Sequence, residues 1–290
     1  MTTRIRTAVF PVAGMGTRFL PATKAIPKEM LPVVDKPLIQ YALEEAMAAG
    51  VDHFVFVTGR SKSAIEDHFD LAVEVENKLR ESGKDGQIDV VNGWMPDAGR
   101  IVYTRQTTPK GLGHAVWCAR ALVGREPFAV LLADDFILAD VPCLKQMVDA
   151  QARAGGTMVA VMEVPRDQTG RYGVIEIGSD DGKLVSVRSV VEKPPPEKAP
   201  SNLCIVGRYI LQPEVFDFLE KQELGTGNEI QLTDAFAPLI RSGKPFHGWR
   251  FSGKRYDCGD KIGWLDANIA VAMSRSDTGE AVRRIIRGYC

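Results

Sequence analysis

The sequence lacks the features that identify several large classes of protein. It has no apolar run long enough to cross a bilayer and no recognisable signal peptide. Its formal net charge is only −1, whereas a general nucleic-acid binder carries a clear basic excess. We therefore expect neither a membrane partner nor a nucleic-acid partner, although a local cationic cleft is compatible with these totals.

Cysteine and histidine are few and scattered. The cysteines are odd in number and none belongs to a Cys-x-x-Cys pair, so they fit neither a disulfide framework nor a zinc site. We interpret them as reduced thiols of a cytoplasmic protein: Cys118, Cys143, Cys204, Cys258 and Cys290. The four histidines have no ligand spacing, and we interpret all of them as structural or surface groups: His53, His68, His114 and His247.

Two common phosphate-binding motifs are also missing. The segment from Thr7 to Ala13 is apolar with little alternation, which is typical of a buried strand in a parallel sheet, and Gly14-Met15-Gly16 follows it. Phe19 stands where a dinucleotide fingerprint needs its third glycine. No Gly-Lys-Ser or Gly-Lys-Thr closes a P-loop. The chain is therefore neither a common dehydrogenase nor a P-loop NTPase.

A long loop takes the place of these motifs. Its glycines let the backbone approach a ligand closely. Pro21, Pro27 and Pro32 keep it out of a regular helix, because proline lacks an N–H and fixes φ. The loop carries three cations, Arg18, Lys24 and Lys28, at the carboxyl end of the first strand. Three cations beside a glycine turn suit a polyphosphate, although a Gly-x-Gly alone is as often only a tight turn.

Apolar periodicity predicts a single α/β domain over residues 1–290. Strands alternate with helices as far as the acidic pair Asp134-Asp135, which implies parallel strands joined by crossovers. A polar helical excursion is predicted near 71–98, antiparallel pairing after 157, and helices near 261–290. Ser63 to Glu66 predicts a capping box, and Glu229 to Phe236 predicts part of a helix. We expect a three-layer α/β sandwich with a mixed, mostly parallel sheet.

The segment from Thr23 to Pro32, Thr-Lys-Ala-Ile-Pro-Lys-Glu-Met-Leu-Pro, closely resembles the signature of sugar nucleotidyltransferases, and in particular of the bacterial UTP–glucose-1-phosphate uridylyltransferases. The resemblance covers essentially the whole chain. It is carried further by Gln106 with Gly111, Asp134-Asp135, Tyr172-Gly173, Glu192-Lys193-Pro194, the 229–234 segment and the 256–260 segment.

This resemblance implies the nucleotide-diphospho-sugar transferase fold and a definite reaction. A uridylyl group would pass from UTP to glucose 1-phosphate, giving UDP-glucose and pyrophosphate. The alternatives are another nucleotide (dTTP, CTP or ATP), another hexose 1-phosphate, or a catalytically silent nucleotide-sugar sensor. No covalent nucleophile is needed, because alignment and fixed positive charge serve an in-line attack on the α-phosphorus.

The resemblance also implies roles for single residues. Arg18 would clamp the outer phosphates, since guanidinium binds phosphate oxygens in a fork. Lys28 and Lys193 would serve the α-phosphate and the sugar phosphate, unless they are surface lysines. The nucleotide would lie on Ala13, Gly14, Gly16 and Thr17. Gln106 and Gly111 would recognise uracil, Gln106 by presenting an acceptor and donors, unless it only caps the following helix.

The sugar and a metal complete the expected site. Glu192 would accept hydrogen bonds from sugar hydroxyls, with Gly173 lining the same pocket. Mg²⁺ prefers oxygen ligands, and we expect Asp134 and Asp257 to hold it. If the strands that precede them belong to one sheet, their carboxyl ends can face each other across the phosphate site; Asp135 and Asp260 are neighbouring candidates. Alternatively, one aspartate caps a helix or pairs with Arg18 or Lys28.

The last two apolar-periodic segments, Trp264 to Met273 and Glu280 to Ile286, are not needed to complete the sheet. We expect them to pack against a second subunit in a homo-oligomer, either a dimer or a tetramer. The alternative is that they fold back on their own domain.

Overall fold

A nine-stranded mixed sheet forms the centre of the computed structural model, which describes residues 4–221, 225 and 228–289. The strands run in the order β5 (Ile101–Arg105), β4 (His53–Thr58), β1 (Thr7–Pro11), β6 (Phe128–Leu131), β11 (Leu203–Leu211), β8 (Thr157–Glu163), β12 (Phe246–Arg250), β10 (Leu184–Glu192) and β9 (Gly173–Asp180). Two small sheets join β7 (Asp135–Leu138) to β13 (Lys254–Asp257) and β2 (Pro32–Val33) to β3 (Lys36–Pro37).

The predicted mixed sheet is confirmed, and it contains both parallel and antiparallel pairs. β5, β4, β1 and β6 are parallel, as is the pair β8–β12. β11, β10 and β9 pair antiparallel with their neighbours. The antiparallel share is larger than expected, because strands joined by a short turn, such as β9 and β10, can pair in no other way.

Helices cover both faces of the sheet, as a three-layer sandwich requires. On one face α1 (Leu38–Ala48), α2 (Ser63–His68) and α7 (Cys143–Ala154) pack on Ala8, Phe10 and other outward residues of the strands. On the other face α5 (Leu112–Cys118), α6 (Arg120–Val123), α8 (Val215–Glu220) and α9 (Phe236–Arg241) pack on Val9 and its neighbours. Alternate residues of each buried strand therefore supply two separate cores.

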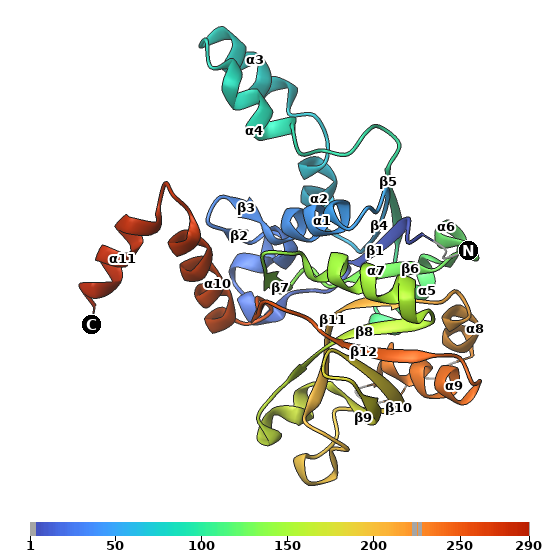
Figure 1. The fold of residues 1–290 in the computed structure, drawn as a ribbon. Helices are drawn as coiled ribbons and strands as arrows, with labels where there is room; N and C mark the ends of the chain where they lie inside the picture. The colour runs from blue at the N-terminus through green and yellow to red at the C-terminus, as the bar shows by residue number, and fades with distance from the viewer. Residues whose placement is uncertain (1–3, 222–224, 226–227, 290) are drawn as a thin grey trace.

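Two helical pairs lie at the margins of the sandwich (Figure 1). The predicted excursion forms α3 (Val73–Glu81) and α4 (Ile88–Asn92), which stand away from the sheet. The closing segments form α10 (Lys261–Ser274) and α11 (Gly279–Arg287). No helix in the described part of the chain is both long and apolar enough to cross a membrane.

Two local predictions were wrong. Ser63 is the first residue of α2 and not its cap; the cap position falls on Lys62. Lys62 makes no side-chain capping bond, because an ammonium group has no acceptor for the free N–H groups of the helix. The 229–236 segment becomes helical only at Thr233, in η8 (Thr233–Ala235). Before that, the Ile230 N–H donates to the Lys110 carbonyl and the Ile230 carbonyl accepts from the N–H of Gly113 in α5, and these bonds replace helical ones.

Candidate active site

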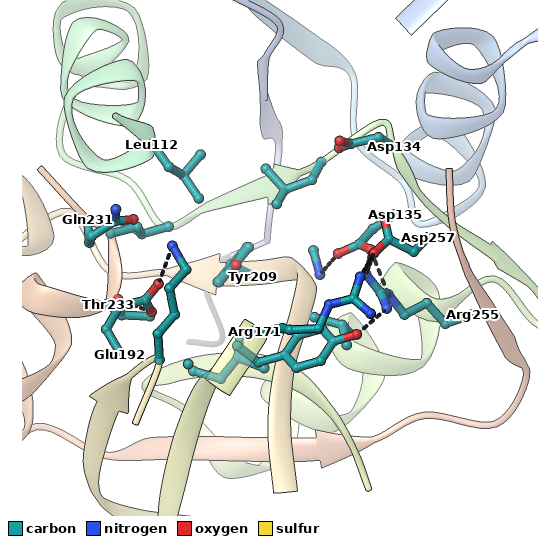
Figure 2. A pocket seen from close by; sticks show the side chains of 18 of the residues that line it. Leu112, Asp134, Asp135, Arg171, Glu192, Tyr209, Gln231, Thr233, Arg255 and Asp257 are labelled. Atoms are coloured by element: carbon teal, nitrogen blue, oxygen red, sulfur yellow. Dashed lines mark hydrogen bonds and ion pairs between the residues drawn. The ribbon is translucent and has the colours of Figure 1, made fainter. Parts of the chain in front are cut away.

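A pocket of about 400 Å³ opens where β6 ends and where β9 and β10 meet (Figure 2). Figure 2 shows Asp134, Asp135 and Asp257 on one side and Glu192, Gln231 and Thr233 on the other, with Tyr209 between them. Six of the residues predicted for the site line it: Arg18, Asp134, Gly173, Glu192, Lys193 and Asp257. Ala13, Gly14, Gly16, Thr17, Lys28, Gln106 and Gly111 lie outside its lining.

The glycine loop after β1 lies beside this pocket and contributes Arg18 to its lining. It winds through three short 3-10 turns, η1 (Thr17–Phe19), η2 (Ala22–Lys24) and η3 (Lys28–Met30). Gly16 has a φ of 66°, and a Cβ built on it would lie 3.0 Å from Cβ of Lys28. Glycine is therefore required at this turn, where the backbone rests directly on the lysine stem and helps to fix the direction of the ammonium group.

A buried ion pair between Lys62 and Glu29 holds this loop in place. Nζ of Lys62 donates to Oε2 of Glu29 at 2.8 Å, and the two residues are 5% and 1% exposed. Burial raises the pKa of Glu29, against the opposing effect of Lys28 and Lys62. The pair ties the loop to the connection between β4 and α2. Sequence analysis assigned no role to either residue, although Glu29 lies inside the signature.

Lys28 reaches the pocket through Asp134. Its Nζ lies 2.5 Å from Oδ2 of Asp134. Burial lowers the pKa of Lys28, but the carboxylates of Asp134 and Glu29 outweigh this effect and raise it. Burial likewise raises the pKa of Asp134, and the Lys28 ammonium outweighs it, so that the pKa is lowered. Both groups therefore stay charged near neutral pH. Of the alternatives left open for Asp134, the pairing with Lys28 is the one observed.

Asp257 is the last residue of a short additional strand, β13, that follows β12. β13 pairs with β7, not with the nine-stranded sheet, and its register places Asp257 opposite Asp135. The strands expected before the two aspartates, β6 and β12, do both belong to the nine-stranded sheet. Because β7 begins directly after Asp134, the small sheet brings Asp257 beside the end of β6. Asp257 also pairs with Arg171 at 3.2 Å.

Arg18, Asp134 and Asp257 converge on one point beside Gly259. A Cβ built on Gly259 would lie 3.0 Å from Oδ2 of Asp134, 3.1 Å from Oδ1 of Asp257 and 3.2 Å from Nη1 of Arg18. The two predicted metal ligands and the predicted phosphate clamp therefore share a small space that only glycine leaves open. Asp260, a neighbouring candidate, instead caps α10 by accepting from two backbone N–H groups.

Asp135, the other neighbouring candidate, is engaged by Arg255. Nε of Arg255 donates to Oδ1 of Asp135 at 2.6 Å, and Nη1 donates to the Tyr172 hydroxyl at 3.1 Å. The other carboxylate oxygen accepts from the backbone N–H of Gly207 at 2.6 Å, where the pairing of β11 with β8 is interrupted. Asp135 is therefore already fully occupied in joining β7, β13 and β11.

The opposite side of the pocket contains the predicted sugar-binding pair. Gly173 and Glu192 are direct partners in the β9–β10 ladder. A Cβ on Gly173 would lie 2.8 Å from Cγ2 of Thr233, whose hydroxyl donates to Oε2 of Glu192 at 2.7 Å. Lys193 has a positive φ of 46°, and its Nζ lies 3.3 Å from Oε1 of Glu192. Glycine at 173 thus allows the close packing that fixes the Glu192 carboxylate.

Gln106 is held in the loop before α5. Its backbone N–H donates to the Thr58 carbonyl, and its side chain is directed toward the start of the helix. Nε2 donates to the Gly111 carbonyl at 3.0 Å. This is not a helix cap in the usual sense, because a capping side chain accepts from free N–H groups. Gly111 has a φ of 100°, and a Cβ there would lie 2.7 Å from the Ile230 carbonyl oxygen.

The pocket residues to which sequence analysis assigned no role include Arg171, Tyr209, Thr233 and Arg255. Two of them had a usable signal. Arg255 lies two residues before Asp257, and alternate residues of a strand share a face. Arg171 immediately precedes the Tyr172-Gly173 motif. Tyr209 sits in β11, which is buried at every position, so its burial pattern does not distinguish it from a core residue.

The whole chain matches known proteins of one kind. The nucleotidyl transferase family model matches residues 8–273. The UTP–glucose-1-phosphate uridylyltransferase of Bacillus subtilis is 48% identical over 285 residues, covering 98% of this chain and 97% of the relative. The protein of the same name from Staphylococcus epidermidis is 47% identical over 284 residues, covering 98% of each chain.

Solved structures agree with these relatives. A UDP-glucose pyrophosphorylase complexed with UDP-glucose superposes with a TM-score of 0.83 at 44% identity, covering 93% of this chain and 100% of the other. A UTP-bound enzyme from Acinetobacter baumannii gives a TM-score of 0.90 at 37% identity, covering 97% and 98%. The chain therefore belongs to the nucleotidyl transferase family and, within it, to the UTP–glucose-1-phosphate uridylyltransferases.

Proposed function

We propose that this chain transfers a uridylyl group from UTP to glucose 1-phosphate, releasing UDP-glucose and pyrophosphate, and that the pocket between Asp134, Asp257 and Glu192 is where it does so. The observation that carries the proposal is the convergence of Arg18, Asp134 and Asp257 beside Gly259, with Glu192 and Lys193 across the same pocket. Charge for a polyphosphate and hydrogen-bond acceptors for a sugar thus occupy opposite sides of one cavity.

The residues divide the work of an in-line displacement. Arg18 clamps the outer phosphates, and the N-terminal glycine loop (Ala13, Gly14, Gly16, Thr17) supports the nucleotide. Lys28 and Lys193 direct positive charge at the α-phosphate and the sugar phosphate, where negative charge builds as the bond to pyrophosphate breaks. Glu192, held by Thr233, accepts hydrogen bonds from sugar hydroxyls and so orients the attacking phosphate.

A divalent metal suits this chemistry, and we propose Mg²⁺ held by Asp134 and Asp257. No group of three or more acidic, histidine or cysteine side chains in the described residues could hold a metal. Two carboxylates suffice for Mg²⁺, however, because it keeps water and phosphate oxygens as its other ligands. When bound, the ion supplies charge that neutralises the outer phosphates. Asp134 must then share its carboxylate between the metal and Lys28.

Of the two closing helices, only α11 favours contact with a second subunit as expected, because α10 packs on its own domain. α10 buries Ala267 and Val271 against Phe19, Leu31 and the surrounding cluster of its own domain. α11 buries only Gly279 and leaves Ile285 58% exposed. We propose that the apolar side of α11 packs on another copy of this chain. Light scattering at micromolar concentration tests this, and a purely monomeric protein would contradict it. The cytoplasmic location stays a prediction.

The activity is tested by pyrophosphate release across a matrix of nucleotides and sugar phosphates. UTP, dTTP, CTP and ATP are each combined with glucose 1-phosphate and with a second hexose 1-phosphate. We expect the highest kcat/KM for UTP with glucose 1-phosphate. A higher value for another pair would change the assigned substrates, and nucleotide-sugar binding without any turnover would favour the sensor alternative.

A further inference from the structure

Of the two flipped orientations of the Gln106 side-chain amide, only one is compatible with its neighbours. The residue is 6% exposed, and its Nε2 lies 3.0 Å from the Gly111 carbonyl oxygen and 3.0 Å from Nδ1 of His114. A backbone carbonyl can only accept a hydrogen bond. The NH₂ group must therefore face Gly111, since the opposite orientation would place two carbonyl oxygens against each other.

This orientation also fixes the state of His114. Both N–H groups of the amide are used, one on the Gly111 carbonyl and the other on Nδ1 of His114. Nδ1 must then be an acceptor, which requires a neutral imidazole with its proton on Nε2. Burial lowers the pKa of His114, and the cations of Lys110 and Arg120 lower it further, so the neutral form is favoured. The ring is also stacked on Trp117.

Only the carbonyl oxygen of Gln106 remains available. Its Oε1 has no hydrogen-bond partner among the residues that the structure describes. Sequence analysis expected Gln106 to offer an acceptor and donors together, but its donors are already used. A pyrimidine would therefore meet a lone acceptor.

We propose that His114 is a positioning residue for base selection, because it holds the Gln106 amide with Oε1 toward the base. The inference rests on the proposed function, in which the base is uracil. Uracil has one N–H on its pairing edge, at N3, whereas cytosine has a lone pair there. An acceptor fixed at that position favours uracil and opposes cytosine. Thymine shares the N3–H of uracil, so this contact does not separate the two.

The test compares two substitutions of similar size in the full-length enzyme. His114→Asn keeps an acceptor, Oδ1, close to the position of Nδ1, and His114→Leu replaces it with a methyl group. Cys118→Ala is the matched control, because Cys118 lies beside His114 on the next turn of α5 and has no hydrogen bond with Gln106 among the described residues. The readouts are the ratios of kcat/KM for UTP over CTP and for UTP over dTTP, together with Tm.

We expect His114→Leu to lower the UTP/CTP ratio by about five- to tenfold, the effect of one lost hydrogen bond, and to leave the UTP/dTTP ratio unchanged. His114→Asn should keep most of the UTP/CTP ratio, and Cys118→Ala should keep both ratios. An unchanged UTP/CTP ratio in the folded His114→Leu variant would overturn the positioning role. An equal fall of the UTP/CTP and UTP/dTTP ratios would also overturn it, because it would indicate general damage to the site. A wild-type enzyme without uridylyl transfer would overturn the proposed function instead.

Discussion

Nζ of Lys28, in the signature loop, lies 2.5 Å from Oδ2 of Asp134, at the end of β6. The two residues are 106 positions apart, and each is assigned to a different part of the reaction, the lysine to phosphate and the aspartate to metal. Each holds the other in its charged form. The pair therefore keeps the Lys28 ammonium and the Asp134 carboxylate adjacent and charged, although burial alone would favour the neutral form of each.

Lys28→Met tests both functions of this pair. Removing charge aimed at the transition state should lower kcat by roughly 100- to 1,000-fold. The free energy of unfolding at neutral pH should fall by only about 1–3 kcal/mol, because the pair is not fully buried and Asp134 keeps some contact with water. Near-normal turnover in a folded variant would contradict the role of Lys28.

The pH dependence of that stability loss has a definite sign. The pKa of Asp134 is lowered in the folded protein, so the aspartate contributes stability above its unfolded pKa of about 3.9 and loses it as the pH falls through the lower folded value. Lys28→Met removes this contribution. We therefore expect the difference in Tm between wild type and variant to stay nearly constant from pH 7 down to about pH 5 and to narrow as the pH falls below about 4. A difference that stays constant below about pH 4 would show that Asp134 is not the group involved.

Lys193→Ala should affect the reaction with almost no cost to folding. The Lys193 side chain is 43% exposed, and its one ion pair among the described residues is with its neighbour Glu192. We expect kcat to fall by roughly 100-fold or more, since charge at the sugar phosphate is lost, while Tm changes little. Lys198→Ala, an exposed lysine nearby that does not line the pocket, is the control. Equal activity of the two variants would remove Lys193 from the site.

Features of the fold that depend on neighbouring residues could be predicted from the sequence, whereas those that depend on residues far apart in the chain could not. The buried strand predicted to begin at Thr7 forms β1 (Thr7–Pro11), because burial of a strand is written into its own residues. The sheet formed by β7 and β13 was not predicted: each strand has four residues, and its partner lies about 120 positions away. The pairing of Arg255 with Asp135 depends on that sheet and could not be derived from either segment alone.

Family resemblance supplied what periodicity could not. It identified Asp257, Glu192 and Gly173, and the structure brings all three to one pocket. It gave no role to Glu29 or Lys62, whose contact is buried and holds the loop from beneath. Periodicity could not predict this pair, because Glu29 and Lys62 lie in separate segments outside the α-helices and β-strands.

The metal assignment is tested by isosteric removal of charge. Asp134→Asn and Asp257→Asn should each raise the Mg²⁺ concentration for half-maximal activity and lower kcat. Asp260→Asn is the matched control, because Asp260 caps α10 and asparagine also caps well; it should leave the Mg²⁺ dependence unchanged. Mg²⁺ titration with a bound nucleotide, followed by calorimetry, gives a readout apart from turnover. If both variants keep the wild-type dependence, the metal is held elsewhere.

Gly259→Ala makes the strongest test of the convergent site, because it adds one methyl group and removes nothing. The φ of Gly259 is not in the left-handed region, so alanine fits its backbone, but the new Cβ would lie 3.0–3.2 Å from Asp134, Asp257 and Arg18. These groups would have to move by a few tenths of an ångström, and misplacement of aligned groups is costly for catalysis.

We expect kcat/KM to fall by at least about tenfold and the Mg²⁺ requirement to rise, with Tm nearly unchanged. Gly86→Ala is the control, since a Cβ at Gly86 meets nothing within 4 Å and its φ is also outside the left-handed region. It should behave as wild type. If Gly259→Ala keeps full activity, the space between Asp134, Asp257 and Arg18 is not where phosphate and metal meet, and the catalytic assignment of all three residues fails together.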